Sequence, residues 1–164
     1  MTEPAKAPPP APREELCKGK FIAMYRRGPW EYVDRVRGST AVGIIALTPE
    51  NRVLFISQHR VPLNAAVIEI PAGLVGDEDG EEGETYAAAA LRELREETGW
   101  QAKSVTMLSY GPLSPGLSSE CVYLVRAEGL SRAEATPGDG TEDITVHEVP
   151  LEEAPGWLAE RVRE

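Results

Sequence analysis

The stretch ETYAAAALRELREETGW, residues 84–100, decides the fold. It contains four consecutive alanines and leucines at positions 91 and 94, and Gly99 follows them as a stop signal. Alanine and leucine favour helices, and glycine is the preferred residue just past a helix end. We therefore predict a helix that begins at Thr85 and stops at Gly99, with the strongest helix signal in the chain.

Three glutamates lie near the C-terminal end of this predicted helix. Glu93, Glu96 and Glu97 stand at i, i+3 and i+4, a spacing that brings their side chains out on one face. The helix dipole disfavours negative charge at this end, so the cluster is either a solvated acidic face or a site that cations neutralise. Because all the donors are oxygens, the expected cation is hard, Mg²⁺ or Mn²⁺ rather than zinc.

Strand-like segments surround this helix. They are rich in β-branched and aromatic residues, and glycine or proline turn signals separate several of them. The predicted strands are 21–27, 30–37, 40–48, 52–58, 67–73, 105–110, 122–126 and 144–149, and an amphipathic helix is expected at about 153–163. Mixed strands around one central and one terminal helix predict a layered α/β or α+β sandwich.

Composition limits the domain organisation and the ligands. A chain of 164 residues that is 41% hydrophobic is long enough for one ordinary domain, which we place at residues 14–164. Residues 1–13 are rich in proline and alanine and are expected to be a disordered arm. The formal charge of −10 disfavours nucleic acid and anionic membranes as partners, so a phosphate ligand needs local arginines or a metal.

Several other classes of protein are disfavoured. Cys17 and Cys121 form neither a disulfide framework nor a CxxC site, and two histidines far apart make a histidine-based metal centre improbable. No signal segment or membrane-length apolar run is present, so the expected location is cytoplasmic. The segment GLSSE at 116–120 is not GxSxG, which removes the serine-hydrolase alternative.

The spacing of charged residues in this stretch resembles a known signature. Glu84, seven residues and then RELREETGW at 92–100 are similar to the Nudix box, G-x5-E-x7-R-E-U-x-E-E-x-G-U, and the match is complete from Glu84 onward. One departure is that Glu78 stands where the box should open with glycine, and Gly73 lies eleven residues before Glu84. The simplest account is a five-residue acidic insertion in the loop at 73–84, which a loop tolerates at small entropic cost.

The resemblance implies a site and a fold. Glu93 and Glu97 would bind the metal together with the backbone carbonyl of Ala72, and Glu96 would be a further ligand or would orient a water. Arg92 would hold the helix acids in place through hydrogen bonds. The implied fold is a Nudix-type α/β/α sandwich: a mixed β-sheet, a central catalytic helix and a C-terminal helix, preceded by an N-terminal antiparallel sheet.

Motifs outside the box resemble the ADP-ribose pyrophosphatase branch of the Nudix superfamily. SQHR at 57–60, EIPAGL at 69–74 and Ser114-Pro115-Gly116 occur in the order and at the spacings of that branch. The implied reaction is hydrolysis of ADP-ribose to AMP and ribose 5-phosphate. Alternatives are another nucleoside diphosphate sugar, a dinucleotide, or a non-catalytic nucleotide-sensing domain.

The branch also implies roles for individual residues. Trp30 would stack on adenine or belong to the core, and Pro115 and Gly116 would lie on the substrate side. Arg60, and less strongly Arg27, would clamp a phosphate unless they are ordinary surface arginines.

A catalytic acid or base is expected in a late loop of the chain. Glu142 is the candidate, with Glu120 and Asp143 as alternatives. Finally, the branch implies a homodimer in which the N-terminal strands, at about 18–38, exchange between subunits, so that Trp30 would serve the partner's site.

Overall fold

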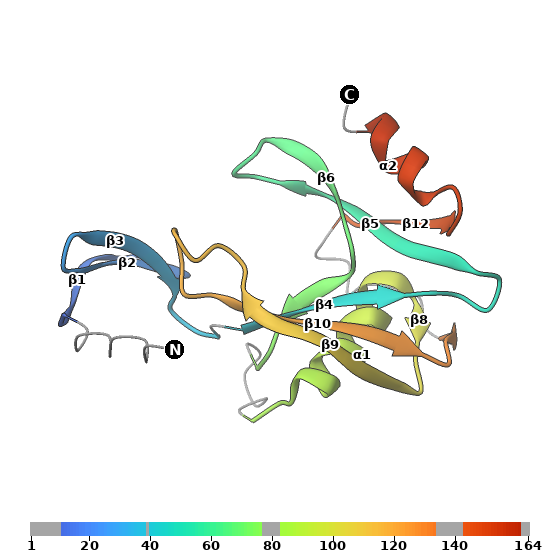
Figure 1. The fold of residues 1–164 in the computed structure, drawn as a ribbon, viewed down its shortest axis with the longest axis horizontal. Helices are drawn as coiled ribbons and strands as arrows, with labels where there is room; N and C mark the ends of the chain where they lie inside the picture. The colour runs from blue at the N-terminus through green and yellow to red at the C-terminus, as the bar shows by residue number, and fades with distance from the viewer. Residues whose placement is uncertain (1–10, 39, 77–82, 134–142, 162–164) are drawn as a thin grey trace, which may run out of the picture.

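The structure is a computed structural model that describes residues 11–38, 40–76, 83–133 and 143–161 (Figure 1). In chain order its elements are β1 (Arg13–Lys18), β2 (Ile22–Arg27), β3 (Trp30–Arg35), β4 (Thr40–Ala46), β5 (Arg52–Arg60), β6 (Ala65–Glu69), β7 (Ala72–Leu74), α1 (Tyr86–Thr98), β8 (Trp100–Gln101), β9 (Ser104–Pro112), β10 (Cys121–Glu128), β11 (Ser131–Arg132), β12 (Thr145–Pro150) and α2 (Ala154–Arg161). The described strands form sheets in the orders β1-β2-β3, β7-β4-β10-β9, β11-β8 and β12-β5-β6.

Helix α1 has the ends that the sequence predicts. The Thr85 side chain accepts a hydrogen bond from the Ala88 N–H at 3.2 Å and caps the first turn. Gly99 adopts the left-handed conformation, with φ of 68°, and its N–H donates to the Arg95 carbonyl at 2.9 Å. These caps fix where the glutamates of the last two turns lie.

The central sheet, β7-β4-β10-β9, is mixed, in agreement with the predicted fold. Strands β4 and β10 pair in parallel, while β4 with β7 and β10 with β9 pair antiparallel. Helix α1 packs on this sheet, and apolar side chains fill the space between them. The fully or almost fully buried members of this core are Val42, Ile44, Ala46, Leu54, Ala89, Ala90, Leu94, Trp100, Val125, Ala127 and Leu130.

Strand β5 lies between the two helices, as a sandwich of layers requires. Leu54 belongs to the core under α1, whereas its neighbour Phe55 belongs to a second core and stacks on Trp157 of α2, with ring centroids 5.5 Å apart. Successive residues of a strand point to opposite faces, so one strand can serve both cores. The predicted α+β class with its central and C-terminal helices is therefore confirmed.

The N-terminal sheet, β1-β2-β3, extends away from this body in Figure 1 and is antiparallel, as predicted. It is tied to the loop that follows β9. The Val33 N–H donates to the Leu117 carbonyl at 2.9 Å, and the Ser119 hydroxyl donates to the Asp34 carboxylate at 2.6 Å. Because Asp34 is buried, these bonds hold the sheet firmly against that loop.

Three features differ from the sequence-based prediction. Strand β1 was not expected, and it begins at Arg13, the last residue of the segment expected to be an arm. Its sequence, REELCK, is mostly polar, and it is a strand because it pairs with β2. The expected strand at 67–73 is divided into β6 and β7 in separate sheets at Pro71, which lacks a backbone N–H. The short pair β8 and β11 also went unpredicted, since two-residue strands carry no periodic pattern.

Candidate active site

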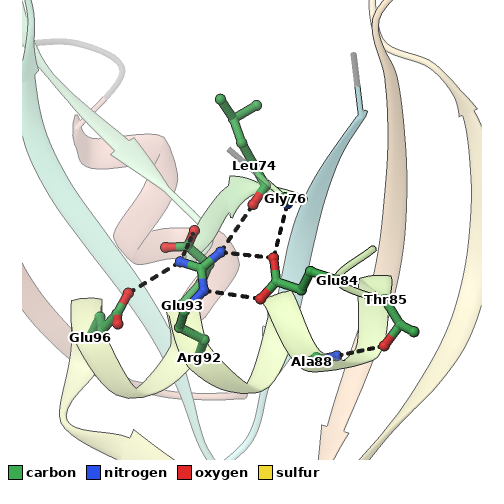
Figure 2. Close-up of polar contacts among 8 residues, drawn as sticks. All are labelled: Leu74, Gly76, Glu84, Thr85, Ala88, Arg92, Glu93 and Glu96. Carbon is green, nitrogen blue, oxygen red and sulfur yellow. Dashed lines mark hydrogen bonds and ion pairs between the residues drawn. The ribbon is translucent and has the colours of Figure 1, made fainter. Parts of the chain in front are cut away.

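Arg92 is the centre of a polar cluster on α1 (Figure 2). Its guanidinium donates to both carboxylate oxygens of Glu84, each at 3.1 Å. It also donates to Glu93 at 2.8 Å and to Glu96 at 3.3 Å. A further bond, at 3.1 Å, reaches the Leu74 carbonyl at the end of β7. One arginine thus connects the start of the helix, its acidic face and the neighbouring strand.

The electrostatics of this cluster favour a permanent positive charge on Arg92. Hydrogen bonding by the Glu84 carboxylate raises the pKa of Arg92 further above its already high usual value. The side chains of Arg92 and Glu84 are only 16% and 7% exposed, so solvent screens their attraction weakly. The charge of Arg92 offsets the repulsion among the neighbouring glutamates. The resemblance to the Nudix box implied hydrogen bonds from Arg92 to these acids, and such bonds to Glu93 and Glu96 are present.

The backbone of β7 contacts the other two glutamates of the site. The Ala72 N–H donates to Glu97 at 2.9 Å. A Cβ atom added to Gly73 would lie 1.9 Å from Cδ of Glu93, so only glycine leaves room for this carboxylate. Glu97 is 7% exposed, and the side chain of Glu93 is 14% exposed. The interpretation of these residues as a solvated acidic face therefore fails for Glu93 and Glu97, whereas the Glu96 side chain is half exposed.

The donors at this site suit a hard divalent cation. Across the described segments, no three His, Cys, Asp or Glu side chains are arranged so that they could hold one metal ion. The buried Glu97 and the partly buried Glu93 nevertheless adjoin the same short backbone segment, Ala72-Gly73. Two carboxylates and a backbone carbonyl make an all-oxygen donor set, which fits Mg²⁺ or Mn²⁺.

A separate hollow of about 290 Å³ contains three of the residues expected to bind substrate. Trp30, Pro115 and Gly116 come from segments far apart in the sequence and line it together. Trp30 is 66% exposed, which removes the alternative that it is a core residue. The other lining residues are Tyr32, Pro112, Ser118 and Ser119. Tyr32 could have been found from the sequence, since it lies two residues after Trp30 and therefore on the same face of the strand.

The two arginines expected to clamp a phosphate lie outside this hollow. Arg60 pairs with Glu69 on the neighbouring strand β6, with Nη2 2.6 Å from a carboxylate oxygen. Arg27 stands opposite Trp30 in the register of β2 and β3. The partner of Arg60 lies nine residues further along the chain on β6, and local sequence patterns did not indicate this pairing because it depends on the register of β5 and β6.

Of the three candidates for the acid or base, the structure describes two. Glu142 lies outside the described residues. Glu120 pairs with Arg35 through a short hydrogen bond, and Asp143 is the first described residue before β12.

The comparison with known proteins is consistent with this geometry. A family model for the NUDIX domain matches residues 39–164, which is most of the chain. The chain belongs to the Nudix hydrolase family. Members of this family generally use divalent metal ions.

Two curated relatives cover most of the chain. The methanol dehydrogenase activator of Bacillus methanolicus is 39% identical over 127 residues, which are 77% of this chain and 66% of that protein. The ADP-ribose pyrophosphatase of Bacillus subtilis is 38% identical over 149 residues, 87% of this chain and 78% of that protein.

A solved structure shares the Nudix fold. The crystal structure of an ADP compounds hydrolase superposes with a TM-score of 0.76, over 96% of this chain and 86% of that one. Its sequence identity is 20%, so this likeness concerns the fold alone. Within the described part of the chain, no helix has the length and apolar character needed to cross a membrane.

Proposed function

We propose that the Nudix hydrolase described here cleaves the diphosphate bond of ADP-ribose, producing AMP and ribose 5-phosphate, with Mg²⁺ as its metal and Mn²⁺ as the alternative. The observation that carries this proposal is a pair of carboxylates against the Ala72-Gly73 backbone, the buried Glu97 and the partly buried Glu93. The similarity to an ADP-ribose pyrophosphatase over 87% of the chain supports this choice of substrate.

In this proposal Glu93, Glu97 and the Ala72 carbonyl hold the metal, with Glu96 as a further ligand or as the group that orients the attacking water. Arg92 positions Glu93 and Glu96 through its hydrogen bonds. A bound divalent ion neutralises and orients the diphosphate, which a protein with a formal charge of −10 could not attract through its overall charge.

The aromatic hollow is the proposed adenine site. The exposed indole of Trp30 provides a broad π face, and Pro115 and Gly116 lie on the same hollow. Arg60 and Arg27 remain candidates for binding the phosphates; Arg60 would have to exchange its bonds to Glu69 for bonds to the substrate. Glu142 remains the proposed acid or base, since Arg35 already engages Glu120.

The proposed assembly is a homodimer in which the N-terminal sheets exchange. Phe21, Ile22 and Trp30 on this sheet are all more than half exposed, as are Leu113 and Leu117 in the adjoining loop. Large apolar side chains left exposed on a projecting sheet suit an interface. The partners would then be a nucleoside diphosphate derivative and a second copy of the chain, and the proposed location is cytoplasmic.

Two alternatives lead to different observations. Another nucleoside diphosphate sugar or a dinucleotide would be cleaved by the same residues but would exceed ADP-ribose in kcat/KM. A non-catalytic nucleotide-sensing role is the other alternative, and one relative is named for activating an enzyme, a methanol dehydrogenase activator. Such a domain would bind nucleotide without turning it over.

The decisive experiment measures product release from ADP-ribose, several nucleotide sugars and diadenosine polyphosphates, each with Mg²⁺, Mn²⁺ or EDTA. We expect metal-dependent cleavage in which ADP-ribose is preferred. Glu97→Gln should keep the fold and lower turnover by roughly two orders of magnitude or more, because metal-ion catalysis contributes several kcal/mol to transition-state stabilisation. The exposed Glu50→Gln is the control and should retain wild-type turnover. Unchanged turnover in Glu97→Gln would remove the metal assignment, and binding without cleavage would favour the sensing role.

A further inference from the structure

Asp34 places a buried carboxylate next to the aromatic hollow that is the proposed adenine site. Asp34 is 8% exposed, and its Oδ2 pairs with Nη2 of Arg13 at 2.8 Å. Its Oδ1 accepts two hydrogen bonds from Ser119, one from the backbone N–H at 3.2 Å and one from the hydroxyl at 2.6 Å. Ser119 itself lines the hollow, so a single residue separates the carboxylate from the space for a ligand.

The position of Asp34 on β3 explains this proximity. Trp30, Tyr32 and Asp34 alternate along the strand, so their side chains lie on the same face of it. Trp30 and Tyr32 line the hollow from β3, whereas Ser119 lines it from the segment that precedes β10. The bonds between Asp34 and Ser119 therefore connect two walls of the hollow that are far apart in the sequence.

The same bonds determine which group Ser119 presents to the hollow. A serine hydroxyl has one hydrogen and two acceptor lone pairs, whereas an ionised carboxylate can only accept hydrogen bonds. The hydrogen of the Ser119 hydroxyl is therefore directed to Oδ1 of Asp34. Because Ser119 is exposed and lines the hollow, a ligand there meets its hydroxyl as an acceptor.

Arg13 supports the carboxylate in this arrangement. Its guanidinium carbon lies 3.4 Å from the centroid of the Tyr25 ring, and Tyr25 stands opposite Tyr32 in the register of β2 and β3. A buried charge needs a partner, and Arg13 provides one at the carboxylate oxygen that Ser119 does not use. The other oxygen is thereby left to orient the Ser119 hydroxyl.

An aromatic wall combined with an acceptor favours a particular class of base. The rings of Trp30 and Tyr32 suit stacking, which any nucleobase can provide. The Ser119 hydroxyl adds a preference, because it binds an N–H donor and opposes a carbonyl, which is another acceptor. Adenine carries an amino group at the ring carbon where hypoxanthine carries a carbonyl. A site that pairs with one group discriminates against an analogue without it, since polar groups are then left unpaired.

From these observations we infer that Ser119 is a specificity-determining residue, which accepts a hydrogen bond from the exocyclic amino group of the adenine ring. Asp34 is the positioning residue that keeps the Ser119 hydroxyl an acceptor. The inference deepens the proposed function and rests on its placement of the base in the aromatic hollow, but it depends neither on the metal nor on cleavage. The substrate class that follows is a diphosphate of adenosine rather than of inosine.

The test compares the dissociation constants of ADP-ribose and of inosine diphosphate ribose for the full chain in EDTA, by calorimetry. The wild type should prefer ADP-ribose about tenfold, the effect of one hydrogen bond replaced by an unpaired acceptor. Ser119→Ala should bring this ratio close to one. Ser118→Ala is the matched control, since it removes from the same hollow a hydroxyl that does not bond to Asp34 in the described structure. It should change both constants by the same factor and keep the ratio.

Asp34→Asn tests the positioning role. Its side chain has one oxygen, where Arg13 and Ser119 use two, so the hydroxyl is no longer held as an acceptor and the ratio should fall. A purely structural defect would weaken the binding of both nucleotides and leave their ratio unchanged. Adding Asp34→Asn to Ser119→Ala should not lower the ratio further, because Asp34 acts through Ser119. Circular dichroism checks folding, and Ser119→Ala decides alone if Asp34→Asn does not fold.

The inference is overturned if the wild type binds the two nucleotides equally or binds neither, or if Ser119→Ala keeps the wild-type ratio. An unchanged ratio in a folded Asp34→Asn variant overturns the positioning role. Turnover distinguishes these results from failure of the proposed function. Metal-dependent cleavage of ADP-ribose without a preference for its base would retain the proposed function and overturn this inference. A preference for the adenine base without cleavage would do the reverse.

Discussion

Gly73 packs against the carboxylate of Glu93, and this contact makes one backbone position critical for the site. An added methyl group would lie 1.9 Å from Cδ of Glu93, but the clash is with the far end of a flexible side chain, which can rotate away. We therefore expect Gly73→Ala to lower turnover at least roughly tenfold through a displaced carboxylate, with a loss of stability near 1 kcal/mol. Steady-state kinetics and urea unfolding would check both parts.

Gly156→Ala provides the matched control for this substitution. A Cβ atom at Gly156 meets nothing within 4 Å, and the residue lies in α2. Alanine there should preserve turnover and stabilise the helix slightly. Equal turnover in Gly73→Ala and Gly156→Ala would contradict the proposed dependence of the site on this contact.

Arg92 should contribute to stability as well as to activity. Replacing it with glutamine leaves Glu84, whose side chain is 7% exposed, without its cationic partner. We expect Arg92→Gln to reduce the free energy of unfolding by roughly 2–4 kcal/mol, because a buried carboxylate that loses its cation is poorly compensated even though the Gly76 N–H still donates to it. Arg95→Gln, at an exposed position of the same helix, should change it by less than about 0.5 kcal/mol. Urea denaturation measures the loss of free energy of unfolding in both variants. An equal loss in Arg92→Gln and Arg95→Gln would mean that the cluster in Figure 2 adds little stability.

For individual residues, the sequence predicted positions on helix α1 better than it predicted contacts between other segments. The spacing of Glu93 and Glu97 predicted that they share a face, and the structure places both against β7. The pairing of Arg60 with Glu69 depends on the contact between the neighbouring strands β5 and β6. Such contacts follow from strand register and sheet packing, which local sequence patterns do not specify.

At the scale of elements, the packing of α2 on β12 and β5 should depend on pH. His147 of β12 hydrogen bonds with Ser57 of β5 at 2.9 Å and lies beside Trp157 of α2. Burial, and then the nearby charge of Arg161, lower the pKa of His147 below its usual value of 6.5. In the interval below 6.5 the unfolded chain binds more protons at this residue than the folded chain, so stability falls as the pH falls.

The measurement compares the free energy of unfolding at about pH 7 and about pH 5 in two variants. His147→Gln should lose less stability over this interval than the wild type, because the titrating group has been removed. His59→Gln should behave like the wild type, since His59 is exposed. A wild-type pH dependence in His147→Gln would show that other groups control the acid sensitivity.

Among the elements, those with a strong local signal could be predicted from the sequence. Helix α1 has its own caps, and β4, β5 and β10 are apolar enough to be recognised as strands. Strand β1 lacks such a signal, and its structure depends on pairing with β2. Strands β8 and β11 also lack a local signal, because each is short and is a strand only through its pairing with the other.

At the scale of the whole molecule, the proposed exchange of N-terminal sheets has a direct test. Trp30→Ala should mainly raise KM through lost stacking, and Glu97→Gln should mainly lower kcat. If Trp30 serves the partner's site, a mixed dimer of the two variants contains one site with both lesions and one with neither. Random mixing after co-refolding should then restore about a quarter of the wild-type kcat/KM. If Trp30 serves its own subunit, every site carries one lesion and mixing restores nothing.

The parallel pairing of β4 with β10 determines when this protein can fold. Thr40 pairs with Cys121, so the two central strands meet only after a loop of roughly 80 residues has closed, a separation that raises contact order and slows folding. During synthesis β4 therefore emerges long before its partner, and its buried residues Val42 and Ile44 have no completed sheet to cover them. The chain must stay unaggregated through this interval without the help of its full negative charge. Residues 1–76 contain ten Lys and Arg against seven Asp and Glu, and the acidic excess lies in the segments made later.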